Sequence, residues 1–205
     1  MDTIMKLLAF SDLHLSISGL ESLKKKIDES KPDYLVCAGD VSIFEENLDW
    51  ILNKLAAFKL PMLAIHGNHE TETNMRHAVE RYSHFTWIHK KAVEVDGVLF
   101  LGFGGGGFAQ IEPDFEDWTA SIEPKLHEGT KLVLVTHAPP YHTKLDELFP
   151  GEHVGVKSFR SWIMRHQKQI VWAISGHIHE TAGKTDTLGQ ARLVNPGGKG
   201  KIVVI

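Results

Sequence analysis

Five short segments rich in histidine and aspartate recur along this chain, and each stands where an apolar run stops. The apolar runs are Lys6 to Phe10, Tyr34 to Ala38, Met62 to Ile65, Leu132 to Val135 and Ile170 to Ile174. The polar segments that follow them are Asp12-Leu13-His14, Gly39-Asp40, Gly67-Asn68-His69-Glu70, Thr136-His137 and Gly176-His177-Ile178-His179. Runs of this length and continuity predict strands that are buried on both faces, as in sheets covered by helices.

Helical patterns fill the gaps between these strands. They cover Gly19 to Ser30, Ile43 to Phe58, Thr71 to Tyr82 and Ser158 to Gln167. Strand followed by helix, repeated at least three times in the first half, predicts a layered α/β fold. In such folds ligands bind where the loops converge at one end of the strands. Seven potential metal ligands and one further histidine would therefore gather in a single place.

The second half of the chain adds turn signals. Asp96-Gly97 separates Ala92 to Val95 from Val98 to Phe103, which predicts a two-residue β-hairpin. The cluster Asn195-Pro196-Gly197-Gly198 separates Ala191 to Val194 from Lys201 to Ile205, which predicts a second antiparallel pair. Two long irregular stretches, 104–113 and 138–155, follow apolar runs, and we expect both to lie over the site or beside it.

The size and charge of the chain restrict its class. Its 205 residues suit one domain with a full core, residues 1–205, and the net charge of −4 gives no general attraction to nucleic acid or anionic membrane. The single cysteine, Cys37, lies inside an apolar run and is expected to be a small buried hydrophobe. The apolar stretch from Ile4 to Phe10 is too short for a membrane span, so a cytoplasmic protein is expected.

The donor types in the five segments indicate which metals they suit. Asp and Asn supply oxygen and His supplies nitrogen, a mixture that suits Mn, Fe, Zn or Ni better than Cu(I) or Ca. Two divalent ions about 3.5–4 Å apart can clamp the attacking and leaving oxygens of a phosphoryl group. A bridging carboxylate is needed to hold two cations so close, and a hydroxide shared by both is then a nucleophile at neutral pH. The segments therefore predict a two-metal hydrolytic centre.

The five segments, in this order, resemble the whole signature of the calcineurin-like metallophosphoesterases. The resemblance covers residues 5 to about 200. Thr136-His137-Ala138-Pro139-Pro140 and Val194-Asn195-Pro196-Gly197 are similar to a small single-domain subgroup, which includes the mammalian metallophosphoesterase-domain proteins and microbial relatives. The resemblance implies an α/β fold built as a four-layer α-β-β-α sandwich with two mixed β-sheets and a dinuclear centre at one edge.

The resemblance also implies a role for each matching residue. Asp12, His14 and His179 would bind the first metal, and Asn68, His137 and His177 the second, with Asp40 bridging both. His69 matches a catalytic histidine that is not a ligand and that donates a proton to the leaving oxygen or stabilises its charge. Two divalent ions per chain follow, with Mn or Fe favoured and Zn, Ni or Mg as alternatives. Asn68 and His69 are also candidate substrate-binding residues.

Weaker signals surround this set. His66 stands where the family usually has proline, and it is interpreted as a side chain at a strand end. Gly104 to Gly107 lacks the spacing of a phosphate-binding loop, so the glycines are expected to let backbone pass close to the site. His153 is either a substrate-phosphate contact or an exposed loop residue, and Tyr141 and His142 belong to a turn or stack on substrate. Histidines without motif context, including His89, are expected at the surface.

The leading functional hypothesis is a metal-dependent phosphoesterase that hydrolyses a small molecule by attack of a metal-bridging hydroxide. A phosphodiester such as a cyclic nucleotide is favoured by the subgroup resemblance alone, because the ligands do not distinguish diester from monoester. A phosphomonoesterase or a nuclease is the alternative on the same centre, and the net charge disfavours nucleic acid. A non-catalytic scaffold of the same fold is a further alternative, which the intact ligand set and His69 oppose. The sequence does not indicate the oligomeric state.

Overall fold

The first of two large β-sheets carries the motifs of the N-terminal half. The computed structural model describes residues 4–205, and the strand order in this sheet is β13-β1-β2-β3-β4. The strands are β1 (Lys6–Phe10), β2 (Tyr34–Cys37), β3 (Met62–Ala64), β4 (Phe85–Trp87) and β13 (Lys201–Val204). β1 to β4 are parallel, and β13 pairs antiparallel with β1. The ligand-bearing loops after β1, β2 and β3 therefore leave the same edge of the sheet.

The second sheet carries the motifs of the C-terminal half in the order β11-β12-β10-β7-β6-β5. Its strands are β5 (Lys91–Val95), β6 (Val98–Phe103), β7 (Lys131–Thr136), β10 (Ile170–Ile174), β11 (Thr185–Leu188) and β12 (Ala191–Val194). The inner strands run parallel, and the edge strands β5 and β11 are antiparallel to their neighbours. The predicted hairpin at Asp96-Gly97 joins β5 to β6. A separate small hairpin is formed by β8 (Glu147–Phe149) and β9 (Glu152–His153).

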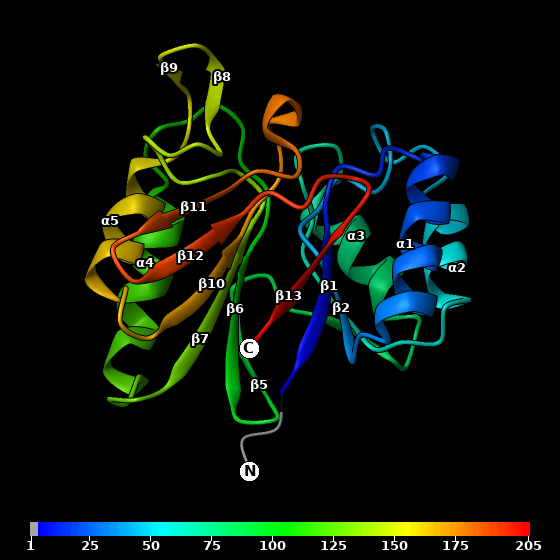
Figure 1. Cartoon of the computed structure of the whole chain (residues 1–205), viewed down its shortest axis with the longest axis horizontal. Helices are drawn as coiled ribbons and strands as arrows, with labels where there is room; N and C mark the ends of the chain where they lie inside the picture. Colours follow the sequence, from blue (N-terminus) through cyan, green and yellow to red (C-terminus); the bar gives the residue numbers. More distant parts are fainter. Residues whose placement is uncertain (1–3) are drawn as a thin grey trace.

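Helices cover the outer face of each sheet, so the fold has four layers (Figure 1). Three helices pack outside the first sheet: α1 (Ile17–Ser30), α2 (Leu48–Ala56) and α3 (Glu72–Val79). Two pack outside the second: α4 (Pro113–Ile122) and α5 (Lys157–Arg165). The short 3-10 helices are η1 (Glu123–Lys125) and η2 (His179–Thr181). The structure thus has the α-β-β-α arrangement with two mixed sheets that the resemblance implies.

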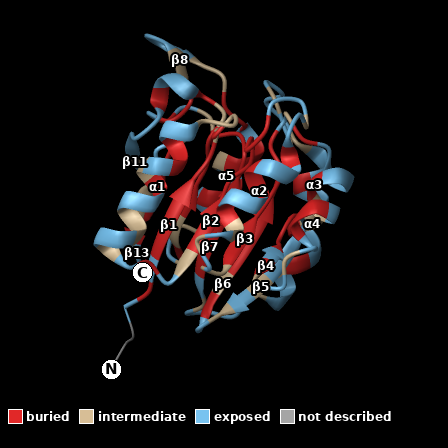
Figure 2. Ribbon diagram, turned by 90° about the vertical axis from the view of Figure 1, so that its right-hand side faces the viewer, coloured by how far each residue is buried: buried red, intermediate tan, exposed pale blue. Residues whose placement is uncertain are grey.

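The alternation of side chains along the strands produces these layers. In β1, Leu8 and Phe10 pack against the helices, whereas Leu7 and Ala9 belong to the core between the two sheets. In β7, Leu132 packs toward α4 and α5 and Val133 toward the first sheet. Successive strand residues point to opposite faces, so a continuous apolar run is required when both faces are covered. Figure 2 shows the central strands β1, β2 and β3 buried behind helices that are exposed on part of their surface.

The second predicted antiparallel pair, 191–205, is wrong. β12 pairs parallel with β10 in the second sheet, whereas β13 crosses to the first sheet and pairs with β1. The connection between them is hydrogen-bonded to the loop after β1, because the Ser11 N–H donates to the Gly197 carbonyl. At the start of β13, Lys201 Nζ donates to the carbonyl of Gly183. Turn residues predict a reversal of the chain, but they do not indicate which sheet the next strand joins.

Two predicted segments have different bounds in the structure. The helix expected over Ile43 to Phe58 begins only at Leu48, because Phe44, Glu45 and Asn47 adopt left-handed backbone conformations with φ between 47° and 67°. The irregular stretch 104–113 ends where α4 begins, with Pro113 in its first turn. Proline suits that position because the first helical N–H groups have no intrahelical partner. Within residues 4–205, no helix combines the length and the apolar character needed to cross a membrane.

Candidate metal centre

Eight polar side chains from five loops meet at the shared edge of the two sheets. Hydrogen bonds hold these loops together there, both within the second sheet and between the two sheets. The His177 N–H donates to Asp12 Oδ1 at 3.1 Å, and the Gly176 N–H donates to the His137 carbonyl at 2.8 Å. His137 Nδ1 in turn donates to the Ala38 carbonyl at 2.8 Å. The two sheets are therefore joined through the residues that the sequence analysis selected.

The local backbone of these loops is unusual. Asp12, His14, Asp40 and His177 all have positive φ, between 43° and 69°. Aspartate and histidine tolerate the left-handed region better than β-branched residues do, and such conformations cluster at functional sites. A left-handed residue shortly after a strand turns the chain sharply at the edge of the sheet. Four of the eight candidate side chains thus stand on sharp turns in the loops that follow the strands.

The first predicted ligand set comes together at the exposed side of the centre. His14 Nε2 and His179 Nε2 are 3.2 Å apart, and His179 Nε2 is 3.7 Å from Asp12 Oδ1. His14 Nδ1 donates to the Ser42 carbonyl at 3.1 Å, which leaves its Nε2 as the nitrogen that faces the centre. The His179 side chain is 60% exposed, so this set is open to solvent.

The second predicted set lies deeper. Asn68 Oδ1 is 3.0 Å from His137 Nε2 and 2.9 Å from His177 Nδ1. His137 is fully buried, and its Nδ1 is already used by the Ala38 carbonyl, so its Nε2 faces the centre. One oxygen, Asp40 Oδ2, lies 3.3 Å from His137 Nε2 and 3.8 Å from His14 Nε2. Asp40 Oδ2 therefore lies between donor atoms of the two predicted sets.

The donor set fits divalent ions. Two donors bound about 2.1 Å from one ion lie roughly 3.0–3.6 Å apart at coordination angles of 90–120°. The measured donor–donor distances are 2.9 to 3.3 Å, which is in or close to that range. They join Asn68 to its two histidine neighbours, His137 to Asp40, and His14 to His179. Three overlapping groups of potential ligands lie within 4.8 Å of one another: Asp12, His14 and His179; His14, Asp40 and His69; and Asp12, Asp40 and His137.

The charges of the centre also suit cations. Burial lowers the pKa of His137, but the hydrogen bond and charge of Asp40 outweigh burial and raise that pKa to about 9. Burial likewise raises the pKa of Asp40, and pairing with His137 outweighs it and lowers the pKa to about 2. Burial lowers the pKa of His177 to about 4, so this imidazole is neutral at pH 7. Ion binding at His137 therefore requires release of a proton, as is usual for histidine ligands.

Glu70 belongs to the third motif, although its residue type and spacing predicted no role for it. Its buried carboxylate accepts the N–H groups of Asp40 at 3.0 Å, Gly67 at 3.1 Å and Ser42 at 2.8 Å, together with the Ser42 hydroxyl. Glu70 thus holds the loops after β2 and β3 against each other. A glutamate directly after the Asn-His pair was a visible signal, but sequence alone does not show which N–H groups it accepts.

His69 lies beside the two sets and is separately oriented. Its backbone N–H donates to Asp40 Oδ1 at 2.9 Å, and its Nε2 is 4.0 Å from Asp40 Oδ2. The Phe44 N–H donates to His69 Nδ1 at 3.4 Å. Because that contact uses Nδ1 as the acceptor, the neutral ring carries its proton on Nε2. The Nε2–H of His69 is therefore the group that can donate a hydrogen bond at the centre.

The structure places His66 in the core behind the centre. Its ring packs against Trp87, with centroids 5.6 Å apart, and against His89, with centroids 4.6 Å apart. His89 is buried too, so the expectation that it lies at the surface is wrong: its Nδ1 accepts the Gly104 N–H at 2.7 Å and its Nε2 is 3.4 Å from Glu72. The polar atoms of His89 are satisfied by backbone and carboxylate, which sequence spacing does not reveal.

The glycine run allows close approach of backbone to His66. A Cβ at Gly104 would lie 2.5 Å from His66 Nδ1 and 2.6 Å from its carbonyl oxygen, whereas a Cβ at Gly107 would meet nothing within 4 Å. Gly104→Ala is therefore expected to lower the free energy of unfolding by about 1–3 kcal/mol, the usual cost of overpacking. Gly107→Ala, in the same run, should change it by less than about 0.5 kcal/mol. Urea unfolding of both variants measures the difference, and equal stabilities would contradict this account.

The segment 138–155 contains a second ordered cluster. Asp146 is fully buried and accepts the N–H groups of His142, Thr143 and Gly155 at 2.7 to 3.0 Å. His153 Nδ1 lies 2.8 Å from Asp146 Oδ1, and the rings of His142 and His153 are 4.4 Å apart. Thr181, two residues after His179, donates its hydroxyl to the Leu145 carbonyl at 2.8 Å. His153 is thus held on a segment that is fastened to η2, which carries His179.

The fold and the centre define the class of protein. The family model described as calcineurin-like phosphoesterase matches residues 5–181, and the chain belongs to that family. An uncharacterized protein of Methanocaldococcus jannaschii is 30% identical over 97% of this chain and 91% of its own length.

Solved structures share the fold at lower identity. The crystal structure of TT1561 from Thermus thermophilus has a TM-score of 0.75 and 17% identity, covering 95% of this chain and 90% of that one. A novel archaeal phosphodiesterase has a TM-score of 0.55 and 15% identity, covering 94% of this chain and 84% of that one.

Proposed function

We propose that this chain is a dinuclear metal-dependent phosphodiesterase that acts on a small molecule such as a cyclic nucleotide. Family membership makes it a phosphoester hydrolase with candidate metal-ligand groups. The observation that carries the proposal is the position of Asp40 Oδ2, within 3.3 Å of a donor of the second set and 3.8 Å of a donor of the first. A carboxylate between two such sets is what a pair of adjacent cations needs in order to share one ligand.

Each residue of the proposed centre has an assigned role, either in holding a metal ion or at the leaving oxygen. Asp12, His14 and His179 would hold one ion, Asn68, His137 and His177 the other, and Asp40 both. When bound, two such ions supply charge neutralisation of the phosphoryl group and an activated hydroxide at neutral pH, and Mn or Fe suits the mixed donors best. His69 would donate a hydrogen bond from its Nε2–H to the leaving oxygen and stabilise the negative charge that develops there, because its Nδ1 accepts the Phe44 N–H.

The open side of the centre supports a diester substrate. Asp40 is 2% exposed at the base of the site, whereas His179 at its rim is 60% exposed. A phosphoryl group that reaches Asp40 therefore has solvent around its substituents, so an ester with two substituents fits without displacing the protein. His153 is included in the proposal as a substrate contact, because Asp146 holds its Nδ1 and leaves Nε2 for a phosphate oxygen.

A substrate panel tests this proposal. The purified protein, loaded with Mn, should hydrolyse bis-p-nitrophenyl phosphate and at least one cyclic nucleotide faster than p-nitrophenyl phosphate or duplex DNA. A His153→Gln variant on the same panel should raise KM with little change in kcat, because it removes a binding contact and leaves the centre intact. Faster turnover of the monoester would assign the centre to a phosphomonoesterase, and degradation of DNA without hydrolysis of small esters would assign it to a nuclease. Absence of any turnover would favour the scaffold alternative.

A further inference from the structure

Two large aromatic side chains are exposed directly beside the metal centre. Phe44 is 73% exposed and Phe108 is 62% exposed. The Phe44 ring lies over His69, with centroids 4.3 Å apart and planes tilted by 35°, and the Phe108 ring lies 5.0 Å from that of His177. Exposed phenylalanines are unfavourable in water, so two of them against site imidazoles at one rim require an explanation.

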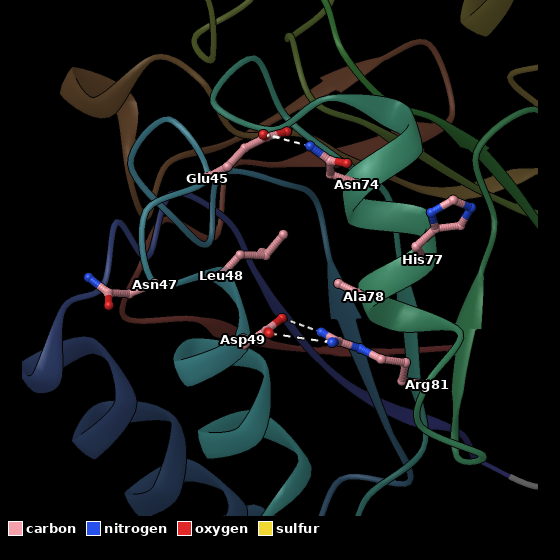
Figure 3. A pocket seen from close by; sticks show the side chains of 8 residues that line it. All are labelled: Glu45, Asn47, Leu48, Asp49, Asn74, His77, Ala78 and Arg81. Carbon is pink, nitrogen blue, oxygen red and sulfur yellow. Dashed lines mark hydrogen bonds and ion pairs between the residues drawn. The ribbon is translucent and has the colours of Figure 1, made fainter.

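The loop that carries Phe44 is rigidly built. Glu45 accepts the N–H and hydroxyl of Thr71 at 2.7 and 2.6 Å and the side-chain amide of Asn74 at 2.7 Å. Figure 3 shows Glu45 reaching from this loop to Asn74 on α3, above a groove of about 470 Å³ between α2 and α3. Phe44 itself has a φ of 47°, which a bulky residue rarely adopts. The backbone that carries Phe44 is therefore fastened to the start of α3, and its ring lies against His69.

The two rings flank the same part of the centre. His69 directly follows Asn68 in the chain, and Asn68 Oδ1 is 2.9 Å from His177 Nδ1. Phe44 therefore lies at the His69 end of this group and Phe108 at the His177 end. A phosphoryl group bound at Asn68 would therefore have an exposed aromatic ring beside His69 and another beside His177.

We propose that Phe44 and Phe108 bind a planar group of the substrate, such as a nucleobase or another aromatic ring attached through the phosphoester. This inference rests on the proposed function, because the planar group must belong to an ester that the centre binds. Aromatic faces stack on planar groups with little regard to their hydrogen-bonding pattern. The phosphoryl group is then recognised by the centre and the organic group by the two rings.

Two ligands that differ only in the planar group test the proposal. Adenosine 5′-monophosphate and ribose 5-phosphate share the sugar and the phosphate, and their dissociation constants for the Mn-loaded protein can be measured by calorimetry, without turnover. The wild-type protein should bind the adenine-bearing ligand about tenfold more tightly or better, the usual size of one base-stacking contact. Phe44→Ala and Phe108→Ala should each reduce this preference severalfold, and Phe44→Trp should keep it. The same ligands used as competitive inhibitors of ester hydrolysis should give the same ranking.

Phe149→Ala is the matched control. Phe149 lies on the β8–β9 hairpin and is 62% exposed, as Phe108 is, and the ring contacts of the described residues pair it with no imidazole of the centre. It should keep the wild-type preference. Equal affinity of the wild type for both ligands, no measurable binding of the adenine-bearing ligand, or an equal loss for both ligands in Phe44→Ala would overturn the inference. A failure of the proposed function is a separate result, because it appears as absence of ester hydrolysis while the calorimetric preference is still measured.

Discussion

Replacing Asp40 by asparagine is expected to remove at least one of two bound metal ions and to lower the melting temperature of the Mn-loaded protein. The wild type should hold two ions per chain after reconstitution. A neutral amide is a poor bridge between cations that repel each other, so both sets lose affinity together. Asparagine tolerates the φ of 54° at this position, and its Oδ1 can still accept the His69 N–H, so the fold itself should persist.

Metal content and the response to added Mn distinguish this effect from simple destabilisation. Excess Mn should raise the melting temperature of the wild type by mass action and should leave that of Asp40→Asn nearly unchanged. Asp146→Asn is the matched control, because Asp146 is an equally buried carboxylate that accepts backbone N–H groups. That variant should lose stability and keep two ions. Two tightly held ions in Asp40→Asn would refute the assigned bridge.

His69→Asn should behave in the opposite way. We expect unchanged metal content and a melting temperature near that of the wild type, with kcat reduced by about 10²–10³-fold, the usual contribution of one hydrogen-bond donor aimed at a developing negative charge. The loss should be greatest for esters with poor leaving groups, because p-nitrophenolate is a stable anion that needs little stabilisation by a hydrogen bond. Metal analysis and kcat for one activated and one unactivated ester measure both effects.

The matched control for His69 is His77→Asn on α3, an exposed histidine outside the centre, which should change neither quantity. If His69→Asn lost a metal ion, His69 would be a ligand; it shares one candidate ligand group with His14 and Asp40. Full turnover of the unactivated ester by His69→Asn would likewise refute its role as the hydrogen-bond donor to the leaving oxygen.

The predicted strands are reproduced closely because their apolar runs are long enough to fill two faces. Leu7 packs between the two sheets and Leu8 packs against the helices, so each face of β1 is covered. The apolar run predicts that both faces are covered, although it does not indicate which elements cover them. Helix starts are predicted less well. Ile43 and Phe44 are apolar at helical spacing, but a left-handed loop at 44–47 exposes them, since this loop is held by Glu45 against Thr71 and Asn74. That anchor joins residues nearly thirty positions apart.

The candidate site likewise was predicted in part from the sequence. The types and order of its residues were readable, because each ligand candidate follows a strand whose end must lie at the loop-bearing edge. The partners that orient them were not: Ala38 for His137, Glu70 for the loops after β2 and β3, and Asp146 for His153. Such contacts depend on backbone direction and on neighbours from other elements, which residue type alone does not encode.

The sequence by itself determined the layered α/β fold, the edge at which the site lies and the chemical nature of its donors, because apolar periodicity and residue type act locally. Only the tertiary structure decided that β13 joins β1 and not β12, that His89 is buried, and that Gly104 must lack a side chain beside His66. The physical reason is common to all three. Each depends on which distant surfaces meet, and the packing of distant surfaces is settled by the whole core and not by any one segment.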